Sequence, residues 1–252
     1  IHRGIAELAY SLHPDVVIRT GDNVDSGGTL SQWNYFFAIE RPVLSSSFVL
    51  SAVGNHEYVG DAAASNYFDL LALPPGPAGT EQFYSFRYNN TLFVALDTEL
   101  SPNDDPNDPN DQYTQLVNAL DAANQPGSGI LWKVVFFHRP AYSSGYHGAD
   151  ADVLAIRNAW APIFSAAGVD VVLSGHDHDY EHLLADGVHY LVIGGAGTAL
   201  RDFTRPALAQ TIYRDGALYH LVVFDADDAE LSVTPYAVDG SPVPDAFSLG
   251  AP

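Results

Sequence analysis

The sequence predicts a mixed α/β fold in which two mixed sheets are flanked by helices. Short apolar runs without polar alternation recur through most of the chain, which is typical of strands buried on both faces. Segments with helical spacing of apolar residues lie between these runs, and the last part of the chain reads as successive strands. Interleaved strands and helices, followed by a run of strands, indicate this architecture.

Each element rests on a local pattern. Apolar residues at helical spacing predict helices at Ile5–Leu12, Ala62–Leu71, Gln112–Ala123 and Asp150–Ala167. Runs of β-branched and aromatic residues predict strands at Val16–Ile18, Phe48–Leu50, Phe83–Arg87, Leu92–Leu96, Trp132–Phe137, Val169–Leu173 and Tyr190–Ile193. The tail reads as two antiparallel strands, Leu218–Phe224 and Leu231–Val238, joined through the turn-rich segment Asp225–Glu230.

The composition is that of one folded domain. Of the 252 residues, 47% are hydrophobic and 12% aromatic, which is enough for a substantial core. No Gly/Ser-rich or Pro-rich linker divides the chain, so we expect residues 1–252 to form a single domain. No apolar stretch approaches the roughly 20 residues that span a bilayer, and the absence of cysteine excludes disulfides and thiolate metal ligands.

The chain is strongly acidic, with a formal net charge of −21 and Lys133 as its only lysine. Nucleic acids and anionic membranes are polyanions, so this charge argues against both as bound partners. A solubilising or salt-adapted surface is the simpler interpretation of the acidity, and a specific cationic partner is the alternative.

Two histidines flank an aspartate in Ser174-Gly175-His176-Asp177-His178, directly after the apolar run Val169–Leu173. At the end of a buried strand, this alternation directs one imidazole to each side of the pleat. One loop can then serve two neighbouring metal ions. Alone the pattern is weak, because a chain with ten histidines contains such pairs by accident.

Three more strand-to-loop junctions carry polar motifs. The motifs are Gly21-Asp22-Asn23-Val24-Asp25, Gly54-Asn55-His56-Glu57 and His138-Arg139-Pro140, each a short step after an apolar run. Because ligands of open α/β sheets collect at the carboxyl ends of the strands, we expect these motifs to meet. A carboxylate, an amide oxygen and imidazoles together suit zinc, iron or manganese.

These four motifs, in this order, resemble those of the calcineurin-like metallophosphoesterase superfamily, and most closely its purple-acid-phosphatase-like branch. The resemblance spans Val16 to His182. It implies a four-layer αββα sandwich, two metal ions (iron, zinc or manganese) and a small phosphate-ester substrate. The implied reaction is hydrolysis of a phosphate mono- or diester by a hydroxide that bridges the two ions.

The resemblance also implies a role for each ligand. Asp22 would bridge both ions, since a carboxylate has two oxygens. By the same resemblance, Asn55, His138 and His176 complete one metal site, and His178 serves the other.

Two neighbouring histidines are candidates for contact with substrate. His56 is expected to donate a proton to the leaving alkoxide or a hydrogen bond to the phosphoryl oxygens, and a histidine satisfied by core hydrogen bonds is the structural alternative. Glu57 is expected to orient His56 or Asn55. His147, in a flexible-looking loop, is expected to contact phosphate, with a solvated loop histidine as the alternative.

Other residues near the motifs are expected to be structural. Arg139 could touch phosphate, but a structural role is the simpler interpretation, and Tyr180, Glu181 and His182 are expected to buttress the His-x-His loop. The acidic segment Ser101–Asp111 is interpreted as a turn-rich surface loop, with calcium binding as the alternative.

Two features depart from the family pattern. The superfamily's first strand, whose terminal aspartate binds the metal that His178 serves, has no counterpart, so we expect an N-terminally truncated form in which that site is weakened. Asp25 stands where purple enzymes carry a tyrosinate. We therefore expect no purple charge-transfer band, and the identity of the metal stays open.

The leading hypothesis is a metal-dependent phosphoric ester hydrolase. The alternative is a metal-binding domain that keeps the fold but is catalytically impaired, which the incomplete second metal site favours. A nuclease is disfavoured by the net charge of −21 and by the absence of a basic track for nucleic acid in the sequence. From the resemblance and the acidity we expect an extracellular or periplasmic location.

Overall fold

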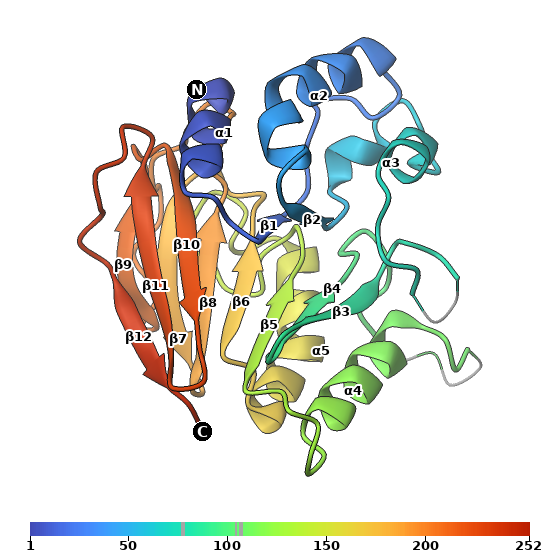
Figure 1. Ribbon diagram of the computed structural model, residues 1–252, viewed down its shortest axis with the longest axis vertical. Coiled ribbons are helices and arrows are strands. Elements are labelled where there is room, and N and C mark those ends of the chain that lie inside the picture. The colour runs from blue at the N-terminus through green and yellow to red at the C-terminus, as the bar shows by residue number, and fades with distance from the viewer. Residues whose placement is uncertain (77–78, 104, 106–107) are drawn as a thin grey trace.

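The computed structural model describes residues 1–76, 79–103, 105 and 108–252, which form a four-layer αββα sandwich (Figure 1). Its helices are α1 (His2–Ser11), α2 (Leu30–Leu44), α3 (Ser65–Leu70), α4 (Gln112–Ala123) and α5 (Ala151–Ala167), with a 3-10 turn η1 (Asn55–Tyr58). In this described part of the chain, no helix is long and apolar enough to cross a bilayer.

Twelve strands make up the two inner layers. They are β1 (Val16–Arg19), β2 (Phe48–Ser51), β3 (Tyr84–Tyr88), β4 (Thr91–Ala95), β5 (Trp132–Phe136), β6 (Val171–Ser174), β7 (Tyr180–Ala185), β8 (Val188–Ile193), β9 (Thr211–Asp215), β10 (His220–Ala226), β11 (Glu230–Ala237) and β12 (Phe247–Gly250). Seven of them form the central sheet, in the order β3-β4-β5-β6-β8-β7-β9. The run β4-β5-β6-β8 is parallel, and β3, β7 and β9 pair antiparallel on either side of it.

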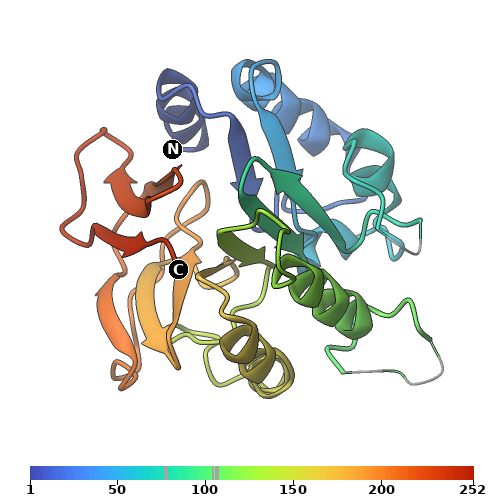
Figure 2. The same ribbon diagram turned by 60° about the horizontal axis from the view of Figure 1, so that its bottom comes forward.

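The central sheet buries a separate core on each face, which is why its parallel strands are continuous apolar runs. Val135 of β5 packs in one core with Leu116 of α4 and Trp160 of α5. Its neighbour Phe136 faces the opposite core, because successive side chains of a strand alternate. Figure 2 shows α4 and α5 on the same side of the sheet.

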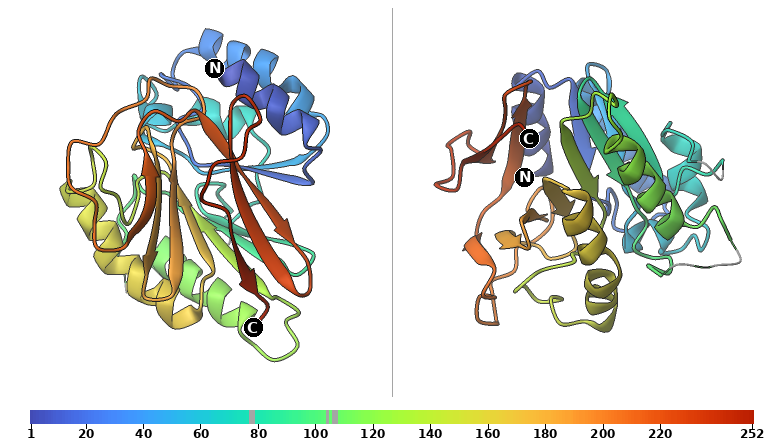
Figure 3. Two further views of the ribbon diagram at one scale, coloured as in Figure 1. Left: turned by 90° about the vertical axis from the view of Figure 1, so that its left-hand side faces the viewer. Right: turned by 90° about the horizontal axis from the view of Figure 1, so that it is seen from below.

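Two small sheets cover the other face. The parallel pair β1-β2 and the antiparallel group β10-β11-β12 contribute Leu50 and Val233 to the second core. Outside them, α1 and α2 lie side by side, as Figure 3 shows. The expected αββα layering is therefore confirmed, as is the antiparallel pairing in the tail, although the second β layer consists of one parallel and one antiparallel sheet in place of a single mixed sheet.

The sequence did not predict five elements: α2, η1, β7, β9 and β12. In α2, Pro42 lies inside the helix, where a proline usually ends or kinks a helical pattern, and the Thr29 side chain at its start forms no cap hydrogen bond. In β7, the polar residues Glu181 and His182 suggested a loop, but both are almost fully buried in the central sheet.

Part of the acidic segment Ser101–Asp111 lies outside the described residues, namely 104, 106 and 107. In its described part, the Asp111 side chain accepts a hydrogen bond from the Thr114 amide at 2.6 Å and caps the start of α4. This capping agrees with the turn-rich interpretation of the segment.

Candidate metal centre

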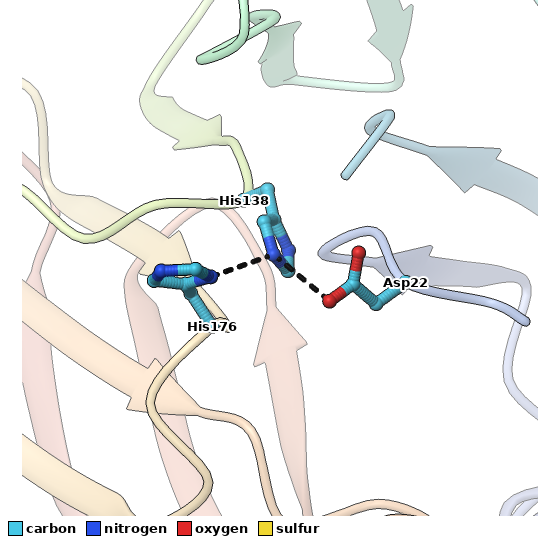
Figure 4. Close-up of side chains that lie close together, drawn as sticks. All are labelled: Asp22, His138 and His176. Carbon is cyan, nitrogen blue, oxygen red and sulfur yellow. Dashed lines mark hydrogen bonds and ion pairs between the residues drawn. The ribbon is translucent and has the colours of Figure 1, made fainter. Parts of the chain in front are cut away.

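Four loops bring oxygen and nitrogen ligands together at the carboxyl ends of β1, β2, β5 and β6. His138 Nε2 lies 3.1 Å from Asp22 Oδ2, 3.0 Å from Asn55 Oδ1 and 3.1 Å from His176 Nδ1. Figure 4 shows Asp22, His138 and His176 directed toward one another, and their ligand atoms all lie within 4.8 Å. The structure therefore brings together four of the five predicted ligands.

The protein positions His138 so that one nitrogen is available to a cation. Nδ1 donates a hydrogen bond to the Thr20 carbonyl at 2.8 Å, which leaves Nε2 facing Asp22 and Asn55. Although burial disfavours a charged imidazole, the Asp22 carboxylate raises the pKa of His138. Burial likewise opposes ionisation of Asp22, yet His138 lowers the pKa of that carboxyl to about 2. The cluster therefore favours a positive charge at its centre, either a proton or a metal ion that displaces it.

Two glycines allow the β1 and β2 loops to touch. Gly21 has φ of +89°, in the left-handed region that favours glycine. A Cβ at Gly54 would lie 2.3 Å from Asp22 Oδ1 and 2.6 Å from the Asp22 amide nitrogen. The glycines of both motifs are therefore required for packing around Asp22.

Glu57 joins the same two loops through their main chains. Its fully buried carboxylate accepts hydrogen bonds from the amides of Asp22 at 2.9 Å, Asn23 at 2.7 Å and Gly54 at 2.8 Å. Burial and the nearby Asp22 charge raise the pKa of Glu57 to about 7. Glu57 was expected to orient His56 or Asn55. Its hydrogen bonds hold the main chain on either side of Asp22 and just before Asn55, two of the predicted metal ligands.

His56 lies at the rim of the cluster, on η1. Its amide donates to Asp22 Oδ1 at 2.9 Å, and its Nδ1 donates to the Asp25 carbonyl at 2.7 Å. The His56 side chain is 38% exposed, so it is not the core histidine of the structural alternative. The Asp25 carboxylate is 87% exposed and lies 3.6 Å from His56 Nδ1.

His178 stands apart from the four clustered ligands. Its Nδ1 donates to the Ala199 carbonyl at 3.0 Å, so its Nε2 carries the lone pair that a metal would need. Among the described residues, the one group of three His, Asp or Glu side chains close enough for a metal is Asp22, His138 and His176. The structure does not bring His178 into that group.

The loop that carries His147 is tied down, although its Ser- and Gly-rich sequence suggested flexibility. Asp177, the middle residue of His-x-His, accepts from the Ser143 hydroxyl at 2.5 Å and from the His147 amide at 2.9 Å. Glu181 accepts from the amide and hydroxyl of Ser144 at 2.6 Å and 2.7 Å. Both carboxylates are fully buried, so the alternation that exposes two histidines also supplies the anchors of this loop.

Of the three residues expected to buttress the His-x-His loop, two point elsewhere. The Tyr180 hydroxyl donates to Asp245 at 2.7 Å, and His182 Nδ1 lies 3.0 Å from the same carboxylate. Successive side chains of a strand alternate, so Tyr180 and His182 lie on one face of β7, and Glu181 on the other face is the one that contacts Ser144.

Arg139 contacts His176, one of the predicted metal ligands, which its expected structural role did not include. Its guanidinium donates to Glu99 at 2.6 Å and 3.0 Å, to Asp152 at 2.8 Å and toward His176 Nε2 at 3.1 Å. Burial above all, followed by the charges of His138 and Arg139, lowers the pKa of His176 to about 2. His176 is therefore neutral. Because Arg139 only donates, Nε2 accepts in this arrangement, and metal binding through Nδ1 requires the other tautomer, in which the bond from Arg139 is lost.

With this geometry in place, the relationship to known proteins is clear. Residues 2–180 match the calcineurin-like phosphoesterase family. The chain belongs to this family. The resemblance carried by the four motifs is thereby confirmed.

Similar proteins also bear out the purple-acid-phosphatase-like branch. Purple acid phosphatase 3 of Arabidopsis thaliana is 27% identical over 266 residues, which cover 94% of this chain and 69% of that protein. Probable inactive purple acid phosphatase 1 of the same plant is 26% identical over 238 residues, which cover 80% of this chain but 37% of that protein.

A solved structure shows the same fold. Purple acid phosphatase PPD1 from yellow lupin (Lupinus luteus) seeds superposes with a TM-score of 0.85 and 22% sequence identity, over 99% of this chain and 48% of its own. This phosphoesterase-family chain therefore spans less than half of PPD1.

Proposed function

We propose that this chain is a metal-dependent phosphoric ester hydrolase. The observation that supports it most directly is the meeting of Asp22, Asn55, His138 and His176 at one point, in a member of a phosphoesterase family. The substrate proposed is a phosphate mono- or diester of small size.

The residues present fit a metal ion. One carboxylate oxygen, one amide oxygen and two imidazole nitrogens form a donor set suited to zinc, iron or manganese. We propose that His178, through its Nε2, and Asp22 serve a second ion. When bound, the ions would polarise a phosphoryl oxygen and lower the pKa of water, the chemistry that two-metal phosphatases use.

The proposed role of His56 is to protonate the leaving alkoxide. Its Nδ1 proton is held by the Asp25 carbonyl, so in the imidazolium form the Nε2 proton is the one available for transfer. The hydrogen bond from the His56 backbone amide to Asp22 Oδ1 holds this residue beside the ligand cluster. A positioned general acid of this kind contributes about 10²–10⁴-fold to rate.

A metal-binding but catalytically impaired domain is the second candidate. It is favoured by the position of His178 outside the ligand group of the described residues, since a second ion then has few protein donors. In this candidate the cluster of His138 still binds metal, and ester hydrolysis is absent.

One experiment separates the two candidates. Metal-free protein is reloaded with zinc, manganese or iron, and its hydrolysis of p-nitrophenyl phosphate and bis(p-nitrophenyl) phosphate is compared with metal content. His138→Ala should lose both metal and activity, whereas His56→Ala should keep the metal and lose about 10²–10⁴-fold in kcat. His13→Asn, an exposed histidine outside the motifs, is the control. Bound metal without hydrolysis would support the impaired domain, and the absence of metal binding would exclude both.

A further inference from the structure

Arg201 reaches the candidate metal centre from the loop after β8. Its amide donates to the His178 carbonyl at 3.0 Å. Its Nη1 lies 3.0 Å from His147 Nε2, and its guanidinium lies over the Tyr146 ring at 5.3 Å. The His147 ring in turn packs against the His176 ring, with centroids 4.2 Å apart. Arg201 is thus connected to both histidines of the His-x-His motif.

Both ring nitrogens of His147 are already engaged. Nδ1 lies 2.8 Å from Asp150 Oδ2, and because a carboxylate only accepts, Nδ1 carries the proton. Arg201 only donates, so Nε2 accepts. A neutral imidazole in this arrangement has no N–H left for a phosphate oxygen.

Arg201, in contrast, keeps donors and charge. In the described part of the chain its Nε and Nη2 have no hydrogen-bond partner, and no carboxylate forms an ion pair with it. Arg139, the other arginine beside the ligands, is paired with both Glu99 and Asp152. In a chain with 31 acidic and 10 basic residues, a guanidinium beside the ligand cluster that forms no salt bridge among the described residues, and acts on the nearby Asp179 carboxyl only through its charge, is suited to an anion.

We propose that Arg201, and not His147, binds the phosphoryl oxygens of the substrate, and that His147 and Asp150 orient the guanidinium. This inference rests on the proposed function and specifies its substrate class. Two oxygens of a phosphate monoester dianion match the planar fork of a guanidinium, whereas a diester carries a single charge. Arg201 therefore favours monoesters.

The test uses the full chain loaded with Zn²⁺. Binding of inorganic phosphate is measured by calorimetry at pH 8, together with KM and kcat for p-nitrophenyl phosphate and bis(p-nitrophenyl) phosphate. In Arg201→Ala the phosphate Kd and the monoester KM should rise about 10–100-fold, as expected for a lost charged hydrogen bond. The diester KM should change less, and kcat little.

Further variants keep the test decisive. Arg201→Lys, which keeps the charge but not the fork, should give an intermediate Kd. His147→Ala should raise the Kd less than Arg201→Ala, because the guanidinium remains. Arg41→Ala removes the same charge from an exposed position on α2 and should leave the Kd unchanged. Zinc content and circular dichroism establish that each variant is folded and loaded.

The opposite ranking would overturn the inference: an Arg201→Ala Kd equal to that of Arg41→Ala, with a larger loss in His147→Ala. Loaded wild-type protein that does not bind phosphate would overturn it as well. Wild-type protein that binds phosphate through Arg201 but hydrolyses no ester would refute the proposed function and leave this inference standing.

Discussion

The Nε2 atom of His138 is the point at which the side chains of three other loops meet. Removing a group that only orients a metal ligand typically weakens metal binding by about 10–100-fold. We predict that His138→Ala weakens zinc binding by more than this. The reason is that Asp22, Asn55 and His176 each lie about one hydrogen-bond length from this atom, at 3.0–3.1 Å, so a shared ion loses its central donor. Zinc content after dialysis against a chelator measures the effect. Unchanged retention of zinc would refute the assignment of His138 as a ligand.

A second residue-scale prediction concerns Gly54. Gly54→Ala should lower the free energy of unfolding by about 1–3 kcal/mol, because its Cβ would lie 2.3 Å from Asp22 Oδ1 in a tightly packed loop. Gly250→Ala is the control, since a Cβ there meets no atom within 4 Å. Urea unfolding of both variants gives the comparison. Equal stability of the two would contradict the close packing of the β1 and β2 loops.

At this scale, the ligand residues of the motifs and their meeting were predictable, and contacts made by residues outside the motifs were not. Asp22 and Asn55 follow strands of the β1-β2 sheet, His138 and His176 follow strands of the central sheet, and the packing of the two sheets brings the four side chains together. Arg201 carries no local signal, because its role depends on a contact with His147, which lies far from it in sequence. Single residues that work through tertiary contacts are therefore hidden from motif reasoning.

At the scale of elements, Asp97 joins β4 to α4 and to η1. Its main chain exchanges hydrogen bonds with the Gln112 side chain at 3.1 Å and 2.9 Å, and its carboxylate accepts from the Tyr58 hydroxyl at 2.7 Å. Burial raises the pKa of Asp97 from 3.8 to about 6, an effect that the bond from Tyr58 only partly offsets.

The pH dependence of stability should reflect this buried carboxyl. With its pKa raised in the folded state, the folded protein binds more protons than the unfolded chain between about pH 4 and pH 6, so the contribution of Asp97 to stability falls as pH rises through that window. The shift corresponds to about 3 kcal/mol. Asp97→Asn should therefore gain stability relative to wild type between pH 4 and pH 7, measured by urea unfolding. Asp121→Asn, at an exposed position of α4, is the control for the substitution itself. A difference between Asp97→Asn and wild type that does not change with pH would contradict the assignment.

Elements were predictable where local pattern and burial agree. The apolar run of β5 and the amphipathic α4 agree in this way, and α4 has the predicted bounds. The strand β7 could not be recognised, because it contains the acidic residue Glu181. Glu181 is buried in the sheet, where it accepts hydrogen bonds from Ser144 of the His147 loop and from Thr211 of β9. A polar residue inside a strand is wrongly interpreted as part of a loop when its buried hydrogen-bond partners lie far away in the sequence.

At the scale of the whole molecule, the net charge of −21 opposes the compact state. We predict that NaCl stabilises the protein, because the Debye length falls from about 30 Å at about 0.01 M to about 3 Å at about 1 M. The midpoint of thermal unfolding should rise by at least roughly 2–4 °C, the shift expected for each kcal/mol gained in a chain of this size. Repeating the scans near the isoelectric point of about 4.4 is the control, since the repulsion vanishes there. A salt effect of equal size at both pH values would show that charge repulsion is not its cause.

The layered architecture was the most predictable property of the whole molecule. Successive residues of β5, such as Val135 and Phe136, enter different cores. The unbroken apolar run at residues 134–137 is typical of a strand buried on both faces. The order of strands in the central sheet was not predictable, because the strand that pairs with β6 is β8 and not β7, which follows β6 in the sequence.

The central claim is that one metal ion is held jointly by the loops after β1, β2, β5 and β6. Anomalous diffraction at the zinc edge, from crystals grown with zinc, tests it directly. We predict a peak bounded by Asp22 Oδ2, Asn55 Oδ1, His138 Nε2 and His176 Nδ1. Zinc found only elsewhere on the acidic surface, with these four side chains unoccupied, would contradict the account.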